Sequence, residues 1–219
     1  MAIQDQIIAT RAYRRHVLKE NSVLDKCRLC KKTNESIQHI TSGCEMLVGS
    51  DYLHRHNNVA KIYHKEVAFV EGMLLCNEEP YYKYKPLKLL EVNGKKLYWD
   101  EAVITDHAIP HNRPDILLLD LKMRTATIID IAVPSDTNVG WTCSEKIRKY
   151  QELAQELKTL YSLVSVRIIP IIISTNGLIP KVTIEGTTFL GLQEAVIKKA
   201  QQSVLLDNCR IVRKFLTIN

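Results

Sequence analysis

The stretch CRLCKKTNESIQHITSGC, residues 27–44, places three thiols and one imidazole close together in an otherwise polar segment. The spacing is Cys27-x2-Cys30-x8-His39-x4-Cys44. Zinc favours four cysteine and histidine ligands in a tetrahedron, and two cysteines separated by two residues can reach one ion from a tight turn. Because four protein ligands leave no open position, we predict a structural zinc site that folds this segment and does no chemistry itself.

Two other interpretations of this stretch stay open at the level of sequence. The four residues can be a chance cluster, or a histidine from the following segment can replace one ligand; the candidates are His54, His56 and His64. Small basic zinc modules usually contact nucleic acid. Basic side chains do surround the first thiol pair here, namely Lys26, Arg28, Lys31 and Lys32.

Length and composition limit the class of protein. A chain of 219 residues suffices for one ordinary domain and a small appendage. It has no run of eighteen apolar residues and its start has no signal-peptide core, so we expect neither a membrane span nor secretion. A net charge of +6 permits nucleic acid as a partner without requiring it. The other thiols should stay reduced and serve as small core residues: Cys76, Cys143 and Cys209.

The first third of the chain is predicted to be helical around the cysteine-rich stretch. Apolar spacing predicts a helix over residues 1–22, whose basic side carries Arg14 and Arg15 and is either a solvated face or a phosphate contact. A second helix is expected over 50–72. The proline-containing segment 77–86 marks a predicted domain boundary. The expected units are a basic helical linker (1–24), the zinc knuckle with its following helix (25–76) and a larger domain (77–219).

The hydrophobic pattern changes after residue 86. Asn93-Gly94 between two short apolar runs predicts a β-hairpin. Further apolar runs predict alternating strands and helices, and this alternation indicates an α/β domain. The predicted strands are 115–120, 125–133 and 164–173, and the predicted helices are 143–161 and 189–206.

Two acidic residues stand out in the predicted strands. If 115–120 and 125–133 are antiparallel, with the turn near Lys122-Met123, then Asp115 faces Asp130 at a Cβ separation of about 4.5–5.5 Å. Two buried carboxylates at that distance repel each other unless a cation joins them. Hard oxygen ligands suit Mg²⁺, which can activate water against a phosphodiester. A one-residue change of register would break the pairing, leaving two strand-end aspartates in solvent.

The next predicted helix carries a pair of lysines. Thr142 and Glu145 fit a capping box at its start. Lys146 and Lys149 are three residues apart and share a face, with Tyr150 adjacent. A lysine near metal-bound carboxylates can stabilise developing charge or orient the attacking water. The alternative interpretation is a solvated basic face.

Together these motifs resemble the C-terminal region of site-specific non-LTR retrotransposon polyproteins. In that family a CCHC zinc knuckle precedes a restriction-like endonuclease with the pattern R/K-P-D, twelve to fourteen residues, D, then KxxKY. Arg113-Pro114-Asp115 matches the first block, Asp130 follows after fourteen residues, and KIRKY at 146–150 matches the last block. The RHN sequence at 55–57 is also similar to the family.

The resemblance implies a PD-(D/E)XK fold, a mixed sheet flanked by helices, preceded by a small helical zinc-knuckle region. It also implies a DNA endonuclease that uses magnesium or manganese to nick target DNA, whose 3′ end then primes reverse transcription. By resemblance, Asp115 and Asp130 bind the catalytic metal, Lys146 and Lys149 are catalytic or contact phosphate, and Tyr150 supports them. The expected partners are DNA, element RNA and the polyprotein's reverse transcriptase, in the nucleus. The expected nucleic-acid contacts are Arg113, Arg55, Arg14 and Arg15.

The sequence departs from the family in three respects. Ala132 stands where the wider PD-(D/E)XK pattern has a lysine, which raises the importance of Lys146 and Lys149. No polymerase motif is present, so the chain is expected to be a fragment, a truncated copy or a repurposed tail. The alternative functions are an idle nucleic-acid-binding module and a zinc-stabilised adaptor for proteins. No N-terminal catalytic acid is evident, and the candidates are Glu71, Asp100, Glu101 and Asp106.

Overall fold

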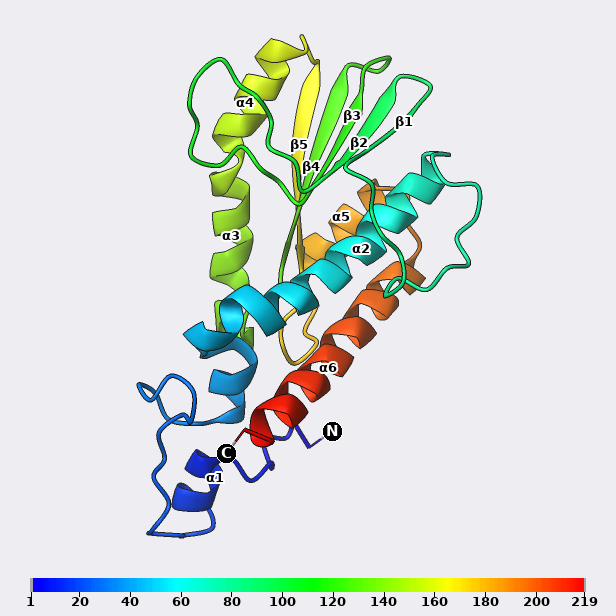
Figure 1. The fold of residues 1–219 in the computed structure, drawn as a ribbon. Helices are drawn as coiled ribbons and strands as arrows, with labels where there is room; N and C mark the ends of the chain where they lie inside the picture. The colour runs from blue at the N-terminus through cyan, green and yellow to red at the C-terminus, as the bar shows by residue number, and fades with distance from the viewer. Residues whose placement is uncertain (1, 219) are drawn as a thin grey trace.

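A mixed five-stranded sheet forms the centre of the molecule in the computed structural model, which describes residues 2–218 (Figure 1). The spatial order is β1-β2-β3-β4-β5; the first three pairings are antiparallel and β4 and β5 are parallel. The α/β architecture with flanking helices is therefore confirmed. The strands are β1 Leu89–Val92, β2 Lys95–Trp99, β3 Ile116–Asp120, β4 Thr125–Ala132 and β5 Ser165–Ile172.

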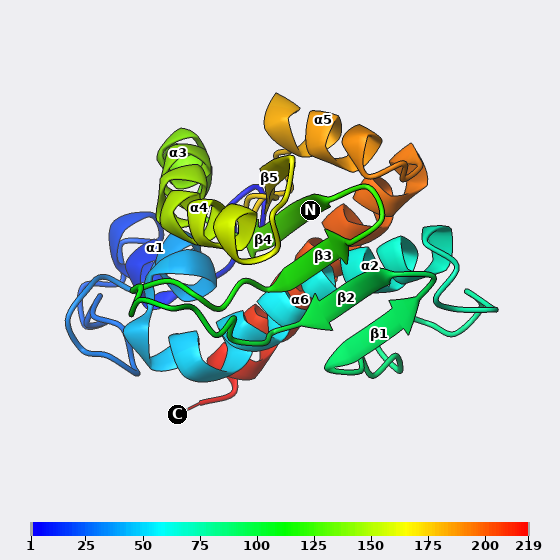
Figure 2. The same cartoon turned by 90° about the horizontal axis from the view of Figure 1, so that it is seen from above.

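Helices cover both faces of this sheet, as the view from above shows (Figure 2). Helices α3 and α4 connect the parallel strands β4 and β5 and lie on one side, whereas α2 and α6 cross the other side. Within the described residues, none of these helices is long and apolar enough to cross a membrane. The helices are α1 Arg11–His16, α2 Leu53–Val70, α3 Val139–Lys149, α4 Gln151–Leu160, α5 Lys181–Phe189 and α6 Glu194–Leu216.

Alternation of side chains along the central strands builds two cores. Successive strand residues point to opposite faces, so Ile129 packs with α2 and α6 while its neighbour Ile128 packs with α4. Both residues are fully buried. Helix α2 was expected to belong with the knuckle, but it contributes Val59 and Tyr63 to the same core as the sheet.

The hairpin and the strand register agree with the sequence. Asn93 and Gly94 both have positive φ, +50° and +82°, as a two-residue hairpin turn with the twist of its strands requires. Ile116 pairs with Ile129 in the antiparallel β3–β4 ladder. The same register places Asp115, directly before β3, opposite Asp130.

The N-terminal helix prediction is wrong. Residues 1–22 were expected to be helical, but α1 covers only Arg11–His16. Thr10 begins it by accepting the N–H of Tyr13, and Lys19, at φ +58°, is incompatible with a continuing helix. Ile3 packs beside the end of α6 rather than along a helical stripe. Tertiary burial therefore overrides the apolar spacing that suggested one long helix.

Three further local predictions are corrected by the structure. The helix expected over 143–161 begins earlier and breaks at Tyr150, so Thr142 lies inside α3 and forms no capping box with Glu145. Helix α5 was not predicted, and the last helix runs to Leu216 rather than ending near residue 206. Cys76 is exposed and is not a core residue; Cys143 and Cys209 are half-buried.

Candidate functional site

The first cysteine pair lies on a tight turn closed by backbone hydrogen bonds. Lys26 and Asn34 form an antiparallel bridge, and the Cys27 N–H donates to the carbonyl of Thr33 at 2.8 Å. The N–H of Lys31 donates to the carbonyl of Cys27 at 3.0 Å, and Lys31 has a φ of +59°. This turn directs both thiols to one side.

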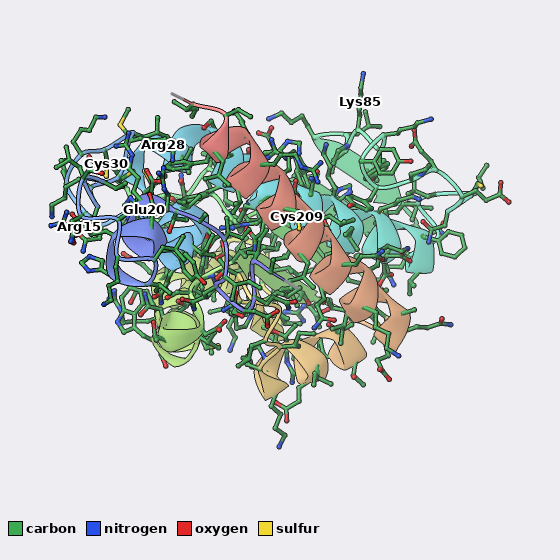
Figure 3. The ribbon with its side chains drawn as sticks, turned by 90° about the horizontal axis from the view of Figure 1, so that it is seen from below. Arg15, Glu20, Arg28, Cys30, Lys85 and Cys209 are labelled. Atoms are coloured by element: carbon green, nitrogen blue, oxygen red, sulfur yellow. The ribbon has the colours of Figure 1, made fainter. Side chains whose placement is uncertain are left out.

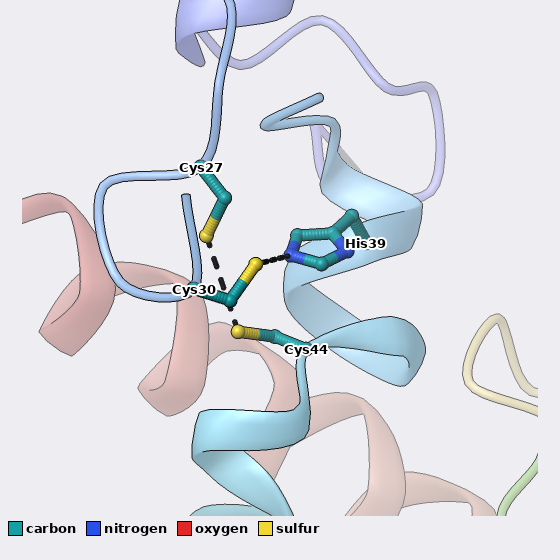
Figure 4. A group of neighbouring side chains, drawn as sticks. All are labelled: Cys27, Cys30, His39 and Cys44. Atoms are coloured by element: carbon teal, nitrogen blue, oxygen red, sulfur yellow. Dashed lines mark hydrogen bonds between the residues drawn. The ribbon is translucent and has the colours of Figure 1, made fainter. Parts of the chain in front are cut away.

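The four predicted ligands converge on one point (Figure 4). Their ligand atoms all lie within 4.8 Å of one another. The sulfurs of Cys27 and Cys44 are 3.9 Å apart, and Nε2 of His39 is 3.4 Å from the sulfur of Cys30. A tetrahedron with Zn–S bonds of about 2.3 Å has edges of about 3.8 Å. These residues can therefore hold a zinc ion, and this part of the prediction is supported by the geometry.

Burial and backbone donors act differently on the thiols. Burial raises the pKa of Cys44 to about 12. Burial opposes ionisation of Cys30 as well, but the N–H groups of Thr33 and Lys32 stabilise its thiolate, and the pKa of Cys30 falls below its ordinary value. A metal binds the deprotonated thiol. Binding zinc at this cluster therefore requires that the buried Cys44 lose its proton.

A buried ion pair anchors the turn to the end of the chain. The Glu35 carboxylate is fully buried and accepts from the Arg28 guanidinium at 2.8 Å and from the N–H of Arg11 at 3.1 Å. Arg28 also donates to the carbonyl of Ile218 at 2.7 Å, next to the last turn of α6 (Figure 3). Arg28 thus holds the knuckle in place, and the basic character of this segment is partly structural.

The acid pair begins with Asp115, which lies just before β3. Its Oδ2 accepts the N–H of Ile131 at 2.6 Å and lies 3.1 Å from Nε2 of His56. The same Nε2 lies 3.2 Å from the carbonyl of Ile131. Burial disfavours the charge on Asp115, but the hydrogen bond and charge of His56 outweigh it and lower the pKa of Asp115. In the sequence, His56 was an alternative zinc ligand and part of the RHN stretch that is similar to the family; its contact with Asp115 was not predicted.

Asp130 lies on β4 with its side chain almost fully buried. Its carboxylate forms an ion pair with Lys146 of α3 and accepts from the Tyr150 hydroxyl at 2.7 Å. Burial and the nearby charge of Asp115 raise the pKa of Asp130. Lys149 donates to the Tyr150 hydroxyl at 2.9 Å. The predicted residues Asp115, Asp130, Lys146, Lys149 and Tyr150 are thus brought together.

The break between α3 and α4 explains how Tyr150 reaches the acids. Tyr150 has φ −104° and ψ 8°, outside the helical range, and its ring is buried beside β3 and α4. Burial, followed by the charge of Asp130, raises the pKa of Tyr150. The neutral phenol is therefore a donor, with Asp130 Oδ1 at 2.7 Å and the carbonyl of Arg113 at 3.1 Å as its two acceptors.

An open hollow of about 320 Å³ lies beside the acid pair. One wall includes Ser42, which lies between the ligands His39 and Cys44, and Val48, which follows them; the other includes Ile131 and Lys146. His56 lines the same hollow. The hollow is therefore lined by Ser42 from the cysteine-rich segment and by His56 and Lys146, the partners of the two acids.

The predicted nucleic-acid contacts differ in accessibility. Arg113 is exposed and pairs with Asp100 through two contacts of 2.8 Å. Arg14 is exposed and pairs with Glu20 at 2.6 Å, whereas Arg15 is half-buried. These three residues remain candidate contacts.

Arg55 requires a correction. Only 2% of it is exposed, and its guanidinium donates to the carbonyl of Thr41 and to Asn208 and lies over the ring of Tyr52. A side chain buried in this way joins α2 to the knuckle and to α6. It is not placed to contact a phosphate.

Three of the candidate N-terminal acids have other partners, and one of them, Glu101, forms an ion pair with Lys88. Glu71 forms an ion pair with Lys95, and the side chain of Asp100 accepts from Arg113. The group from α2 that contacts the acid pair is instead His56.

No protein-family model matches this chain and no curated protein matches its sequence. A function must therefore be proposed from the residues of the chain itself.

Proposed function

We propose that this chain is a metal-dependent DNA endonuclease with a PD-(D/E)XK fold. One observation carries the proposal: extending the β3–β4 register by one residue puts Asp115, directly before β3, opposite Asp130 of β4, and Lys146 and Tyr150 both contact Asp130. Carboxylates on adjacent strands, a lysine and a nearby open hollow form a set that can hold and cleave a phosphodiester. The mixed sheet flanked by helices is compatible with this fold.

The acid pair fits a divalent cation by its chemistry. Carboxylate oxygens are the hard ligands that Mg²⁺ and Mn²⁺ prefer. Burial and, after it, the charge of Asp115 raise the pKa of Asp130, and a cation bound between the two carboxylates would offset both effects. When bound, such an ion lowers the pKa of a water and stabilises charge on the phosphate.

The remaining residues would position the substrate and the acids. Lys146 provides the cation that Ala132 lacks on β4, and it can stabilise charge that develops on the scissile phosphate. Tyr150 donates to Asp130 and fixes the direction of its carboxylate. Lys149, which touches the Tyr150 hydroxyl, can contact the phosphate on the same helix face.

The zinc knuckle would bind the nucleic acid next to the acid pair. Zinc holds the segment that forms one wall of the hollow, and Arg113, Arg14 and Arg15 are the proposed backbone contacts. We assign the chain to the C-terminal region of a non-LTR retrotransposon polyprotein. Its proposed partners are then target DNA, element RNA and the reverse transcriptase domain of the parent protein, and its proposed place of action is the nucleus.

A second candidate function is nucleic-acid binding without cleavage. The observation that favours it is that each acid already has a protein partner, His56 for Asp115 and Lys146 for Asp130. Such pairing can neutralise the buried carboxylates without any metal. In that case the zinc knuckle and its basic surroundings would only hold DNA or RNA.

Nicking of supercoiled plasmid in Mg²⁺ or Mn²⁺ distinguishes the endonuclease from the binding module. We expect the zinc-loaded wild type to nick the plasmid. The nicking rate of Asp130→Asn should be at least about 100-fold lower, because loss of a residue that only hydrogen-bonds to a metal ligand already lowers metal affinity or activity about 10- to 100-fold. Asp120→Asn is the matched control, because Asp120 lies at the other end of β3 and near Lys95. If no variant cuts but all bind DNA with strong salt dependence, the chain is a binding module.

A further inference from the structure

Helix α2 brings a histidine to the acid pair from outside the sheet. His56 lies in the first turn of α2 (Leu53–Val70), and its Nε2 is within hydrogen-bond distance of both Asp115 Oδ2 and the Ile131 carbonyl, at 3.1 and 3.2 Å. A carboxylate and a carbonyl only accept hydrogen bonds. Nε2 of His56 must therefore carry a hydrogen, and the imidazole acts here as a donor.

Both donors to the Asp115 side chain converge on the same oxygen. The N–H of Ile131 lies 2.6 Å from Oδ2, and Nε2 of His56 lies 3.1 Å from the same oxygen. The carboxylate is thereby fixed in rotation, with its second oxygen, Oδ1, left for another ligand. The Asp115 side chain keeps 20% of its surface exposed, and Oδ1 is not among the buried side-chain atoms of the described residues that have no hydrogen-bond partner.

We propose that His56 is a positioning residue of the proposed nuclease: it clamps Oδ2 of Asp115 so that Oδ1 is presented to the divalent cation. This inference rests on the proposed function. It gives α2 a role beyond packing, because the contact joins this helix to the ends of β3 and β4 at the site.

The fold of α2 has other support, which makes the role of His56 separable from stability. Val59, Ile62 and Tyr63 of the same helix are buried in the main core. The His56 side chain is 25% exposed and lines the open hollow next to Lys146. Replacement of the imidazole should therefore disturb the carboxylate more than the helix.

The test compares His56→Leu, which removes the donor at similar size, with His56→Gln, whose amide nitrogen can reach the place of Nε2. His107→Leu is the control, since His107 lies in an exposed loop with its side chain 82% exposed. Mn²⁺ binding to the zinc-loaded protein is measured by titration calorimetry, and nicking is measured as a function of Mg²⁺ concentration. Melting temperature and zinc content confirm that each variant is folded.

We expect His56→Leu to weaken Mn²⁺ binding and to raise the Mg²⁺ concentration for half-maximal nicking about 10- to 100-fold, as for other partners of metal ligands. His56→Gln should recover most of this loss, and His107→Leu should match the wild type. If His56→Leu fails to fold, His56→Asn replaces it, because its amide is one methylene too short to reach Asp115.

Three different results would overturn the inference. Wild-type Mn²⁺ affinity in His56→Leu, with wild-type nicking, removes His56 from the site but leaves the nuclease intact. Absence of Mn²⁺ binding and of nicking in the wild type itself removes the proposed function, and the role of His56 with it. Equal losses in the Leu and Gln variants would also contradict a donor role.

Discussion

At the scale of single residues, the hydroxyl of Tyr150 is the most sharply defined contact of the site. Only 1% of the residue is exposed, and the hydroxyl donates to Asp130 and accepts from Lys149. Tyr150→Phe removes the donor and leaves a buried carboxylate with one partner fewer. We expect the free energy of unfolding to fall by about 1–3 kcal/mol, measured by urea denaturation at neutral pH.

The control for Tyr150→Phe is the same change at an exposed tyrosine. Tyr82 is 63% exposed, and Tyr82→Phe should leave the unfolding free energy within about 0.5 kcal/mol of the wild type. Equal effects of the two substitutions would mean that the Tyr150 hydroxyl contributes nothing specific to Asp130.

Residue roles divide into those that spacing can predict and those that depend on packing. Asp115 and Asp130 could be paired from the sequence, because opposed positions on two antiparallel strands sum to a constant. His56 and Arg55 are adjacent on α2, yet one meets Asp115 and the other is buried against Asn208 of α6. Which way each points depends on how α2 lies across the sheet and α6, and no local pattern encodes that.

At the scale of structural elements, we expect the cysteine–histidine segment to depend on a bound zinc ion. The segment is short and polar, and its regular structure is limited to a bridge and a five-residue π-helix, His39–Gly43. Cys27 and Cys44 are also part of a core shared with the end of α6, where Val212 and Phe215 lie. Loss of zinc should therefore loosen the knuckle and the end of α6 together.

Cys44→Ser tests this dependence. We expect the variant to lose its zinc and to unfold at a lower temperature; a loss of about 3 kcal/mol corresponds to about 6–12 °C for a chain of this size. Metal content and thermal unfolding are the measurements. Cys76→Ser, at an exposed thiol outside the cluster, should keep both the zinc and the melting temperature. Unchanged melting of Cys44→Ser would contradict a structural role for the ion.

Elements with a strong local code were predicted well, and those set by tertiary contacts were not. Asn93-Gly94 specifies its turn through backbone conformations that few residues adopt, so the hairpin was confirmed. The helix expected over 1–22 rested on weak spacing alone, and burial of Ile3 against α6 overrode it. Helix α5 packs so closely on β5 that a Cβ on Gly186 would lie 2.5 Å from Ile169, a relation that neither segment shows by itself.

At the scale of the whole molecule, α2 connects the acid pair with the 71–88 segment and β2. It meets Asp115 near its start through His56, and further along it buries His64 where the 71–88 segment and β2 come together. Nδ1 of His64 is 2.9 Å from the Tyr84 hydroxyl, and its ring packs edge-on against Trp99 at 5.4 Å. His64 is fully buried, and within the described residues its Nε2 has no hydrogen-bond partner.

Burial lowers the pKa of His64 to about 4, from 6.5 in the unfolded chain. As the pH falls below 6.5, His64 binds a proton in the unfolded chain but stays neutral in the native state. The free energy of unfolding therefore decreases until about pH 4. The full effect corresponds to about 3 kcal/mol. We expect His64→Phe to lose stability less steeply than the wild type between pH 6.5 and 4, with the difference measured by urea denaturation across this range. Tyr84→Phe keeps the buried imidazole, so its stability should fall with pH as steeply as that of the wild type. If the stability of His64→Phe also falls in parallel with that of the wild type, His64 does not couple acid to unfolding.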